Sequence, residues 1–212
     1  MNDLTLYIET TPRFSEVALA CAEWTEVFQA EERTGSRDLA ALVRRAFQTR
    51  DVKPSDLSGI AIDIGPGALS SVRVGVAFAN ALAYGLGVET RGYASLDVMG
   101  HAAGNAANTQ TISVVRGPDS AVYAGCWGGE HQGKHWVVSK DEAADHFIGQ
   151  ALRNGAILAG PATETVREWL GDVPFDEAVA HSSAARLIAI DRSENRVTGV
   201  PSQNPIVGEN FR

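Results

Sequence analysis

The stretch GIAIDIGPGALSSVRVGVAFANALAYGL runs from Gly59 to Leu86 and decides the fold. It opens with a run of Ile and Ala that is typical of a buried strand. Gly65-Pro66-Gly67 then turns the chain sharply, because glycine adopts unusual φ angles and proline fixes its own. Ser70 is the predicted N-cap of the helix that follows. Strand, tight turn and helix in this order predict an α/β domain.

The helix is unusual because it carries no charged residue from Val74 to Leu86. A surface helix normally has one apolar stripe and a charged back. We therefore expect both faces to be covered, one by the protein's own sheet and the other by a second protein. The alternative is a core helix covered on both sides within its own subunit. A membrane span is not expected, since it needs about 20 apolar residues.

The same pattern predicts a two-fold interface built from the helices Asp38–Thr49 and Ser70–Leu86. The large side chains of Phe78, Leu82 and Leu86 are expected to face the sheet, and the small ones the partner helix. The predicted interface residues are Leu39, Leu42, Val43, Phe47, Val72, Val76, Ala79, Asn80 and Ala83.

The segment from Ile62 to Gly75 resembles the Gly-Pro-Gly-Ser-Phe-Thr-Gly-Leu-Arg-Ile-Gly signature of the TsaB (YeaZ) family. Five signature residues match outright: Gly65, Pro66, Gly67, Arg73 and Gly75. Ser71 replaces a family glycine and is the largest departure. Weaker matches are Tyr93–Leu96, Ala121–Ala124 and the ending Asn210–Arg212.

The order of the expected elements repeats along the chain. Each half begins with three short strands and continues with helices and a further strand, which predicts two related α/β lobes. The resemblance implies the same fold: two actin-like (ASKHA, ribonuclease H-like) lobes, each a mixed sheet that starts with a three-strand meander and is flanked by helices. The Gly-, Asn- and Ala-rich segment from Gly104 to Gln110 is the expected joint, so the predicted lobes are residues 1–104 and 105–212.

The resemblance also implies a function. TsaB-type proteins are non-catalytic scaffold and activator subunits in the synthesis of N6-threonylcarbamoyladenosine at position 37 of tRNA. The implied partner is a TsaD-like protein, bound through the helices of the first lobe. A TsaE-like ATPase would be reached through the complex, tRNA would be contacted only indirectly, and the chain alone would form a homodimer.

Candidate catalytic residues are isolated in the sequence. The turns after the first strand of each lobe carry Glu9 and Asp119, with prolines where a nucleotide site needs backbone donors. The resemblance places the metal ligands of TsaD at Ser95 and Met99, and neither suits a metal; His101 stands nearby. We therefore expect no catalytic residues, no metal site and no cofactor.

One further pair of histidines has metal-ligand spacing, His131 and His135. That spacing brings two ligands together only on a helix, and this segment reads as a turn between strands. We expect a solvent-facing hairpin there.

Composition narrows the function further. A net charge of −8 argues against a protein that grips nucleic acid by itself. Cys21 and Cys126 have no metal-ligand spacing and are predicted to be buried, reduced thiols. The start of the chain does not read as a signal peptide, which favours the cytoplasm. Two rival functions remain open: an actin-fold enzyme, such as an M22 glycoprotease-like hydrolase or a small kinase, and a diverged homodimer outside the tRNA pathway.

Overall fold

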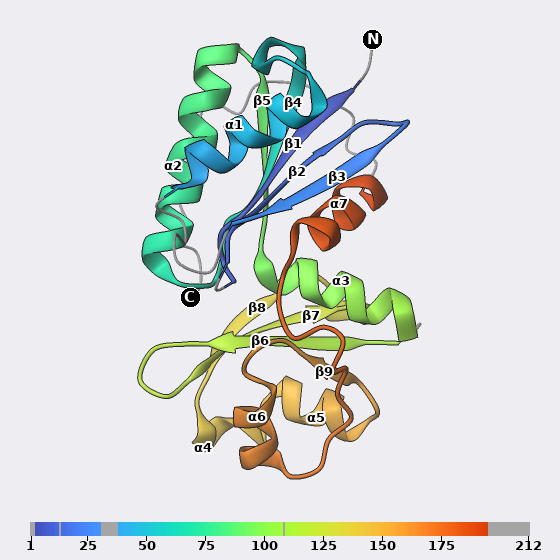
Figure 1. The fold of residues 1–212 in the computed structure, drawn as a ribbon. Coiled ribbons are helices and arrows are strands. Elements are labelled where there is room, and N and C mark those ends of the chain that lie inside the picture. Colours follow the sequence, from blue (N-terminus) through green and yellow to red (C-terminus); the bar gives the residue numbers. More distant parts are fainter. Residues whose placement is uncertain (1–2, 13, 31–37, 108, 195–212) are drawn as a thin grey trace. The chain divides into compact units, whose positions relative to one another are not determined.

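The computed structural model describes residues 3–12, 14–30, 38–107 and 109–194. Within them the chain forms two compact units (Figure 1). Unit 1 contains the residues up to Ala94 and those from Ser183 onward, and unit 2 contains Ser95–Ser182.

Unit 1 is built on a five-stranded sheet with the order β3-β2-β1-β4-β5. The strands are β1 (Leu4–Glu9), β2 (Glu16–Ala20), β3 (Thr25–Gln29), β4 (Leu57–Asp63) and β5 (Glu89–Tyr93). β1, β2 and β3 form the expected antiparallel meander, while β4 and β5 pair in parallel. The register places Ile8 beside Ile62, so Glu9 and Asp63 end neighbouring strands at the same edge of the sheet.

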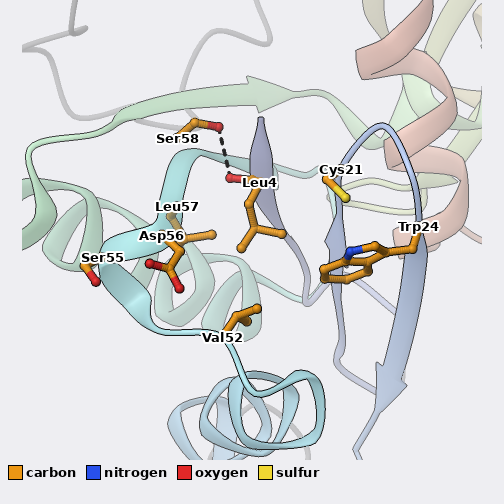
Figure 2. A pocket seen from close by; sticks show the side chains of 8 residues that line it. All are labelled: Leu4, Cys21, Trp24, Val52, Ser55, Asp56, Leu57 and Ser58. Carbon is orange, nitrogen blue, oxygen red and sulfur yellow. Dashed lines mark hydrogen bonds between the residues drawn. The ribbon is translucent and has the colours of Figure 1, made fainter. Parts of the chain in front are cut away.

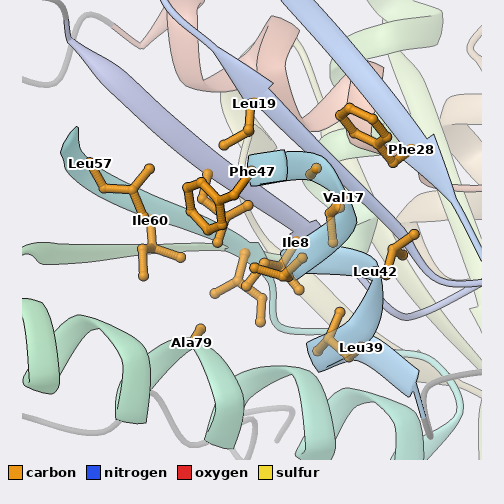
Figure 3. Close-up of a cluster of buried hydrophobic side chains, with 14 of the residues drawn as sticks. Ile8, Val17, Leu19, Phe28, Leu39, Leu42, Phe47, Leu57, Ile60 and Ala79 are labelled. Carbon is orange, nitrogen blue, oxygen red and sulfur yellow. The ribbon is translucent and has the colours of Figure 1, made fainter. Parts of the chain in front are cut away.

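Helices cover both faces of this sheet (Figure 1). α1 (Leu39–Arg50) and α2 (Leu69–Leu86) lie on one face, and α7 (Ala184–Ser193) lies on the other. The alternation of β1 explains the two layers, because successive side chains of a strand point to opposite faces. Leu4, Leu6 and Ile8 belong to the core cluster under α1 and α2, in which Figure 3 labels Ile8. Tyr7 points to α7 and donates a hydrogen bond to Asp191.

Unit 2 has a four-stranded sheet with the order β8-β7-β6-β9. Its strands are β6 (Thr111–Arg116), β7 (Val122–Trp127), β8 (His135–Val138) and β9 (Ile157–Ala159). α3 (Ser95–Ala107) packs on one face; α4 (Lys140–Ala143), α5 (Phe147–Arg153) and α6 (Thr163–Leu170) pack on the other. β6, β7 and β8 form a second antiparallel meander, as expected.

Several predicted element bounds are wrong. The N-cap of α2 is Ala68 rather than Ser70, and its side chain makes no capping hydrogen bond. The chain between Ser139 and Asn154 forms two short helices, α4 and α5, and the side chain of His146 caps the second one. The expected joint at Gly104 lies inside α3, because Gly100 and Gly104 both pack against Trp127.

The unit division also departs from the expected lobes. α3 belongs to unit 2, and α7 returns to unit 1, where it packs on β1, β2 and β4. The expected ending Asn210–Arg212 lies outside the described residues. Cys21 and Cys126 are free cysteines and both are buried, which confirms their predicted burial.

α2 has a markedly apolar composition. Its 18 residues are long and apolar enough to cross a membrane by length and composition alone, contrary to the sequence-based expectation. Core helices of globular domains meet the same criterion. Here the buried side of α2 packs on β4, β5 and β1, which makes it a layer of unit 1.

Candidate interaction surface on helix α2

The turn between β4 and α2 is held by its own backbone. Gly65 has φ +92°, a conformation that favours glycine, and it precedes Pro66 through a cis peptide bond. The carboxylate of Asp63 accepts a hydrogen bond from the Gly65 amide at 2.8 Å. The first two residues of the signature therefore set the path of the chain into α2.

The other two signature glycines let two elements touch. A Cβ atom at Gly67 would lie 2.9 Å from Thr11 Cβ, and one at Gly75 would lie 2.5 Å from Thr10 Oγ1. Thr10 is fully buried, and its hydroxyl donates to the carbonyl of Ser71 at 3.0 Å. These glycines therefore allow the start of α2 to dock on the turn after β1.

The departure at Ser71 fits this arrangement, because the contact with Thr10 uses the backbone carbonyl of residue 71 rather than its side chain. Arg73, the last signature residue on the helix that is not glycine, is exposed. It is the one charged residue of α2.

Most of the predicted interface residues face inward, which corrects the predicted face. Leu39, Leu42, Val43 and Phe47 lie in the core between α1 and the sheet (Figure 3). On α2 the buried residues are Val72, Gly75, Ala79 and Ala83. Only Val76 and Asn80 of the predicted set are half-buried.

The physical reason is the close approach of α2 to the sheet. Gly75 touches Thr10 and Ala79 is fully buried, so there is room only for small side chains on the inner face. The large residues Phe78, Leu82 and Leu86 lie half-buried at the flank instead. The prediction assigned the small residues to a partner, but the protein's own sheet takes them.

The open face of α2 is the opposite one. Its exposed large side chains are Leu69 at 60% exposure, Val74 at 45% and Tyr84 at 92%. Ala77 and Ala81 lie exposed between them. We call Leu69, Arg73, Val74, Ala77, Ala81 and Tyr84 the outer α2 face.

A signal for this face existed in the sequence. Arg73 is the one charge on the helix, and charges mark the side that faces water. Ala77 follows Arg73 by one turn, and Ala81 follows by two, so both share its side of the helix.

The residues considered for catalysis are buried or held in turns within their own units. Glu9 is fully buried, and its Oε1 accepts hydrogen bonds from the amide and hydroxyl of Thr11 at 2.8 and 2.6 Å. Asp119 sits in a turn at φ +48°. Ser95 and Met99 are both buried, and Met99 is part of the core beneath α3.

The histidines considered as metal ligands have separate neighbours. His131 stacks on Phe147 with ring centroids 4.0 Å apart, whereas His135 Nε2 lies 2.8 Å from Asp97 Oδ1. His101 is buried edge-on against Trp127, and burial lowers its pKa. No group of three potential metal ligands occurs among the described residues.

The family is decided by comparison with known proteins. Residues 29–167, well over half of the chain, match the family model described as TsaD: tRNA N6-adenosine threonylcarbamoyltransferase. The chain belongs to this family. The tRNA N6-adenosine threonylcarbamoyltransferase of Desulfitobacterium hafniense (strain Y51) is 32% identical over 124 residues, which are 54% of this chain and 34% of that protein. The chain thus matches about a third of the length of this curated relative.

Two solved structures share the fold of this TsaD-family chain over nearly its whole length. YeaZ from Pseudomonas aeruginosa has a TM-score of 0.76 at 18% identity and covers 97% of this chain and 98% of its own. A second structure from the same organism, described as similar to peptidase YEAZ, has a TM-score of 0.74 at 18% identity and covers 94% and 98%. The predicted fold of two lobes, each with a meander-led mixed sheet, is confirmed.

Proposed function

We propose that this chain is a non-catalytic subunit in the synthesis of N6-threonylcarbamoyladenosine on tRNA, and that its outer α2 face binds a TsaD-type threonylcarbamoyltransferase. Family membership and the YeaZ-like fold support the pathway. The proposed role places the protein in the cytoplasm, where a TsaE-like ATPase and tRNA would meet it only through the complex.

The observation that carries the proposal is the outer α2 face. Three of the five exposed large hydrophobic side chains of the described residues lie on this one helix: Leu69, Val74 and Tyr84. An apolar stripe of this kind marks a protein interface. The signature turn helps to present this face, because the close contacts of Gly67 and Gly75 with the turn after β1 hold α2 on the sheet.

The arrangement of side chains favours a second helix that runs antiparallel. Ala77 lies at the middle of the outer face, and exposed residues stand at equal distances on either side of it. Leu69 matches Gly85, Ser70 matches Tyr84, and Arg73 matches Ala81. Each pair joins a large residue to a small one, so an identical helix related by a two-fold axis at Ala77 would interlock.

Such a face can serve two partners in turn. An isologous contact accepts a second copy of the chain, and it also accepts a homologous helix of similar shape. We therefore infer a homodimer in the isolated protein that gives way to a complex with the TsaD-type protein. An interface of standard size would bury about 1,600 Å² in total.

The inferred absence of catalysis rests on the positions that the family uses for metal. Ser95 and Met99 stand there, and the side chain of Met99 is packed among Leu96, Ala103 and Val115. A thioether in an apolar core offers no ligand to a hard cation. The proposed role of the chain is consequently to bind and position the transferase.

Binding to the TsaD-type protein of the same organism tests the proposal. The change Ala77→Glu places like charges face to face at the two-fold axis of the homodimer and buries an unpaired charge in the complex, so we expect both to weaken at least a hundredfold. The matched control is Val137→Glu, which adds the same charge at an exposed residue of β8 in unit 2 and should bind as the wild type does.

Sedimentation and calorimetry measure both equilibria, and mass spectrometry of tRNA nucleosides measures the modification in cells. Cells that carry only Ala77→Glu should lose threonylcarbamoyladenosine, and cells with Val137→Glu should keep it. A wild-type chain that fails to bind the TsaD-type protein contradicts the proposed function. Unimpaired binding by Ala77→Glu contradicts the assignment of the face.

A further inference from the structure

A cavity opens in unit 1 at the end of β1 that is remote from the signature turn. Its volume is about 540 Å³, within the range of small-molecule sites in proteins. It lies between the start of β1, the β2–β3 turn and the segment that links α1 to β4 (Figure 2). The described residues that line it include Leu4, Cys21, Trp24, Val52, Asp56 and Leu57.

Trp24 forms one wall, and its indole ring is held in place from outside. The guanidinium of Arg50 lies 3.9 Å from the ring centroid, and Arg50 also forms an ion pair with Glu26 at 3.2 Å. Stacking between a guanidinium and an indole is attractive, and the ion pair orients the guanidinium. The wall is therefore formed before any ligand arrives.

The β2–β3 turn that carries this wall is fixed as well. Arg192 of α7 donates hydrogen bonds to the carbonyl of Cys21 at 2.9 Å and to the hydroxyl of Thr25 at 3.2 Å. The thiol of Cys21 donates to Glu23 at 3.1 Å. Leu4, Cys21 and Leu57 are all buried and make a floor that is apolar apart from this thiol.

The charge of the cavity is negative. Among the described residues that line it, Asp56 is the one charged side chain, and Ser55 and Ser58 supply hydroxyl groups. One oxygen of Asp56 accepts a hydrogen bond from the Lys53 amide at 2.7 Å, and no ion pair among the described residues involves Asp56. Ser58 uses its hydrogen in a bond to the carbonyl of Leu4 at 3.0 Å, so it offers lone pairs.

We propose that this cavity binds a small cationic amine with an aromatic or aliphatic body. The body lies on the apolar floor beside Trp24, and the ammonium group meets the carboxylate of Asp56. Ammonium groups are donors only, which suits a rim that presents a carboxylate and hydroxyl lone pairs. The site is independent of the outer α2 face and of the proposed function.

The test uses the full chain and three probes of one shape and different charge: 2-phenylethylamine, 2-phenylethanol and 3-phenylpropionate. Calorimetry should rank the amine first and the carboxylate last. An exposed ion pair is worth up to about 1 kcal/mol, so the amine should bind about two- to fivefold tighter than the alcohol. Asp56→Asn should remove that difference and leave the binding of the alcohol unchanged.

Position is tested by two further measurements. Val52→Trp fills the cavity and should abolish binding of the amine. In the wild type the amine should slow alkylation of Cys21 but not of Cys126, which lies in unit 2 and serves as an internal reference by mass spectrometry. Protection of Cys21 keeps the test decisive if Val52→Trp fails to fold.

The proposal is wrong if the amine does not bind at about 10 mM, because a dissociation constant above this concentration corresponds to less than about 2.7 kcal/mol of binding free energy. It is also wrong if the alcohol or carboxylate binds as tightly as the amine, which would point to an apolar side chain of a partner as the occupant. Equal protection of both cysteines contradicts the location.

Discussion

Removal of the Asp191 carboxylate is expected to release α7 from unit 1. Asp191 accepts hydrogen bonds from Tyr7 at 2.7 Å, from Tyr93, and from Arg91 Nε and Nη2 at 2.7 and 2.8 Å. The side chains of Arg91 and Asp191 are only 16% and 8% exposed. The change Asp191→Ala would therefore leave a largely buried guanidinium without its counter-ion.

The magnitude follows from that burial. Breaking a buried ion pair by removing one partner costs about 3–5 kcal/mol, because the remaining charge keeps its desolvation cost. Total stabilities of domains are about 5–15 kcal/mol, so the loss is a large fraction of the whole. For a chain of this size the melting temperature should fall by roughly 6–20 °C.

Urea unfolding followed by fluorescence measures the loss, and hydrogen exchange places it. Exchange should rise in α7 and β1 and stay unchanged in β6 and β7 of unit 2. Asp172→Ala is the matched control, because Asp172 is 96% exposed in its pair with Arg167 and should matter by less than about 0.5 kcal/mol. The double change Asp191→Leu with Arg91→Met should recover part of the loss, since it removes the stranded charge.

A loss for Asp191→Ala that stays within 1 kcal/mol of the Asp172→Ala control would refute this reasoning. The pH dependence provides a second check. Burial alone would raise the pKa of Asp191, but the hydrogen bonds from Arg91, Tyr93 and Tyr7 outweigh it and hold the pKa below its usual value. The stabilisation is thus present above the unfolded pKa of about 4 and is lost as the pH falls through the folded value.

Two further perturbations test the signature turn and a helix cap. Gly75→Ala should lower the free energy of unfolding in urea by about 1–3 kcal/mol, because the added Cβ meets Thr10. Gly85→Ala, where a Cβ would have no neighbour within 4 Å, should be neutral or stabilising. Equal effects of the two changes would contradict the packing role of Gly75. Burial lowers the pKa of His146, whose Nδ1 accepts a hydrogen bond from the Ile148 amide, so the stability that the neutral ring contributes is present above about pH 6.5 and is lost as the pH falls. His146→Asn should keep the helix cap and reduce the dependence of the unfolding free energy on pH in this range. An unchanged pH dependence would show that His146 is not its source.

The sequence was sufficient for the elements that have a clear local pattern. Both meanders follow from short apolar strands separated by turn residues, and α1 and α2 follow from apolar residues at helical spacing. Periodicity alone did not reveal which side of α2 faces the sheet, because that helix is apolar nearly all round. The close approach of Gly75 to Thr10 determines which side of α2 faces the sheet, and these two residues lie far apart in the sequence.

The prediction of a joint from Gly104 to Gln110 is wrong for a related reason. The Gly-, Asn- and Ala-rich composition predicts a joint, but in α3 the glycines let the helix lie against Trp127. Small residues serve both purposes, and only the tertiary contact distinguishes them. The packing of α7 on unit 1 could not be predicted from the sequence either, since Asp191 and Tyr7 are separated by almost the whole length of the chain.

The return of α7 also fixes the order in which the protein can be assembled. Unit 1 begins with β1 and is completed by α7, so unit 2 is an insertion between its parts. On the ribosome, β1 to β5 emerge first, yet one face of their sheet stays uncovered until residues 95–182 have also been made. Among the described residues unit 2 is one continuous segment, Ser95–Ser182, which can fold before α7 has been made. The lobe that is translated first is thus the last to be finished, and a fragment cut at Ala94 would leave Tyr7, Arg91 and Tyr93 without the carboxylate that they share.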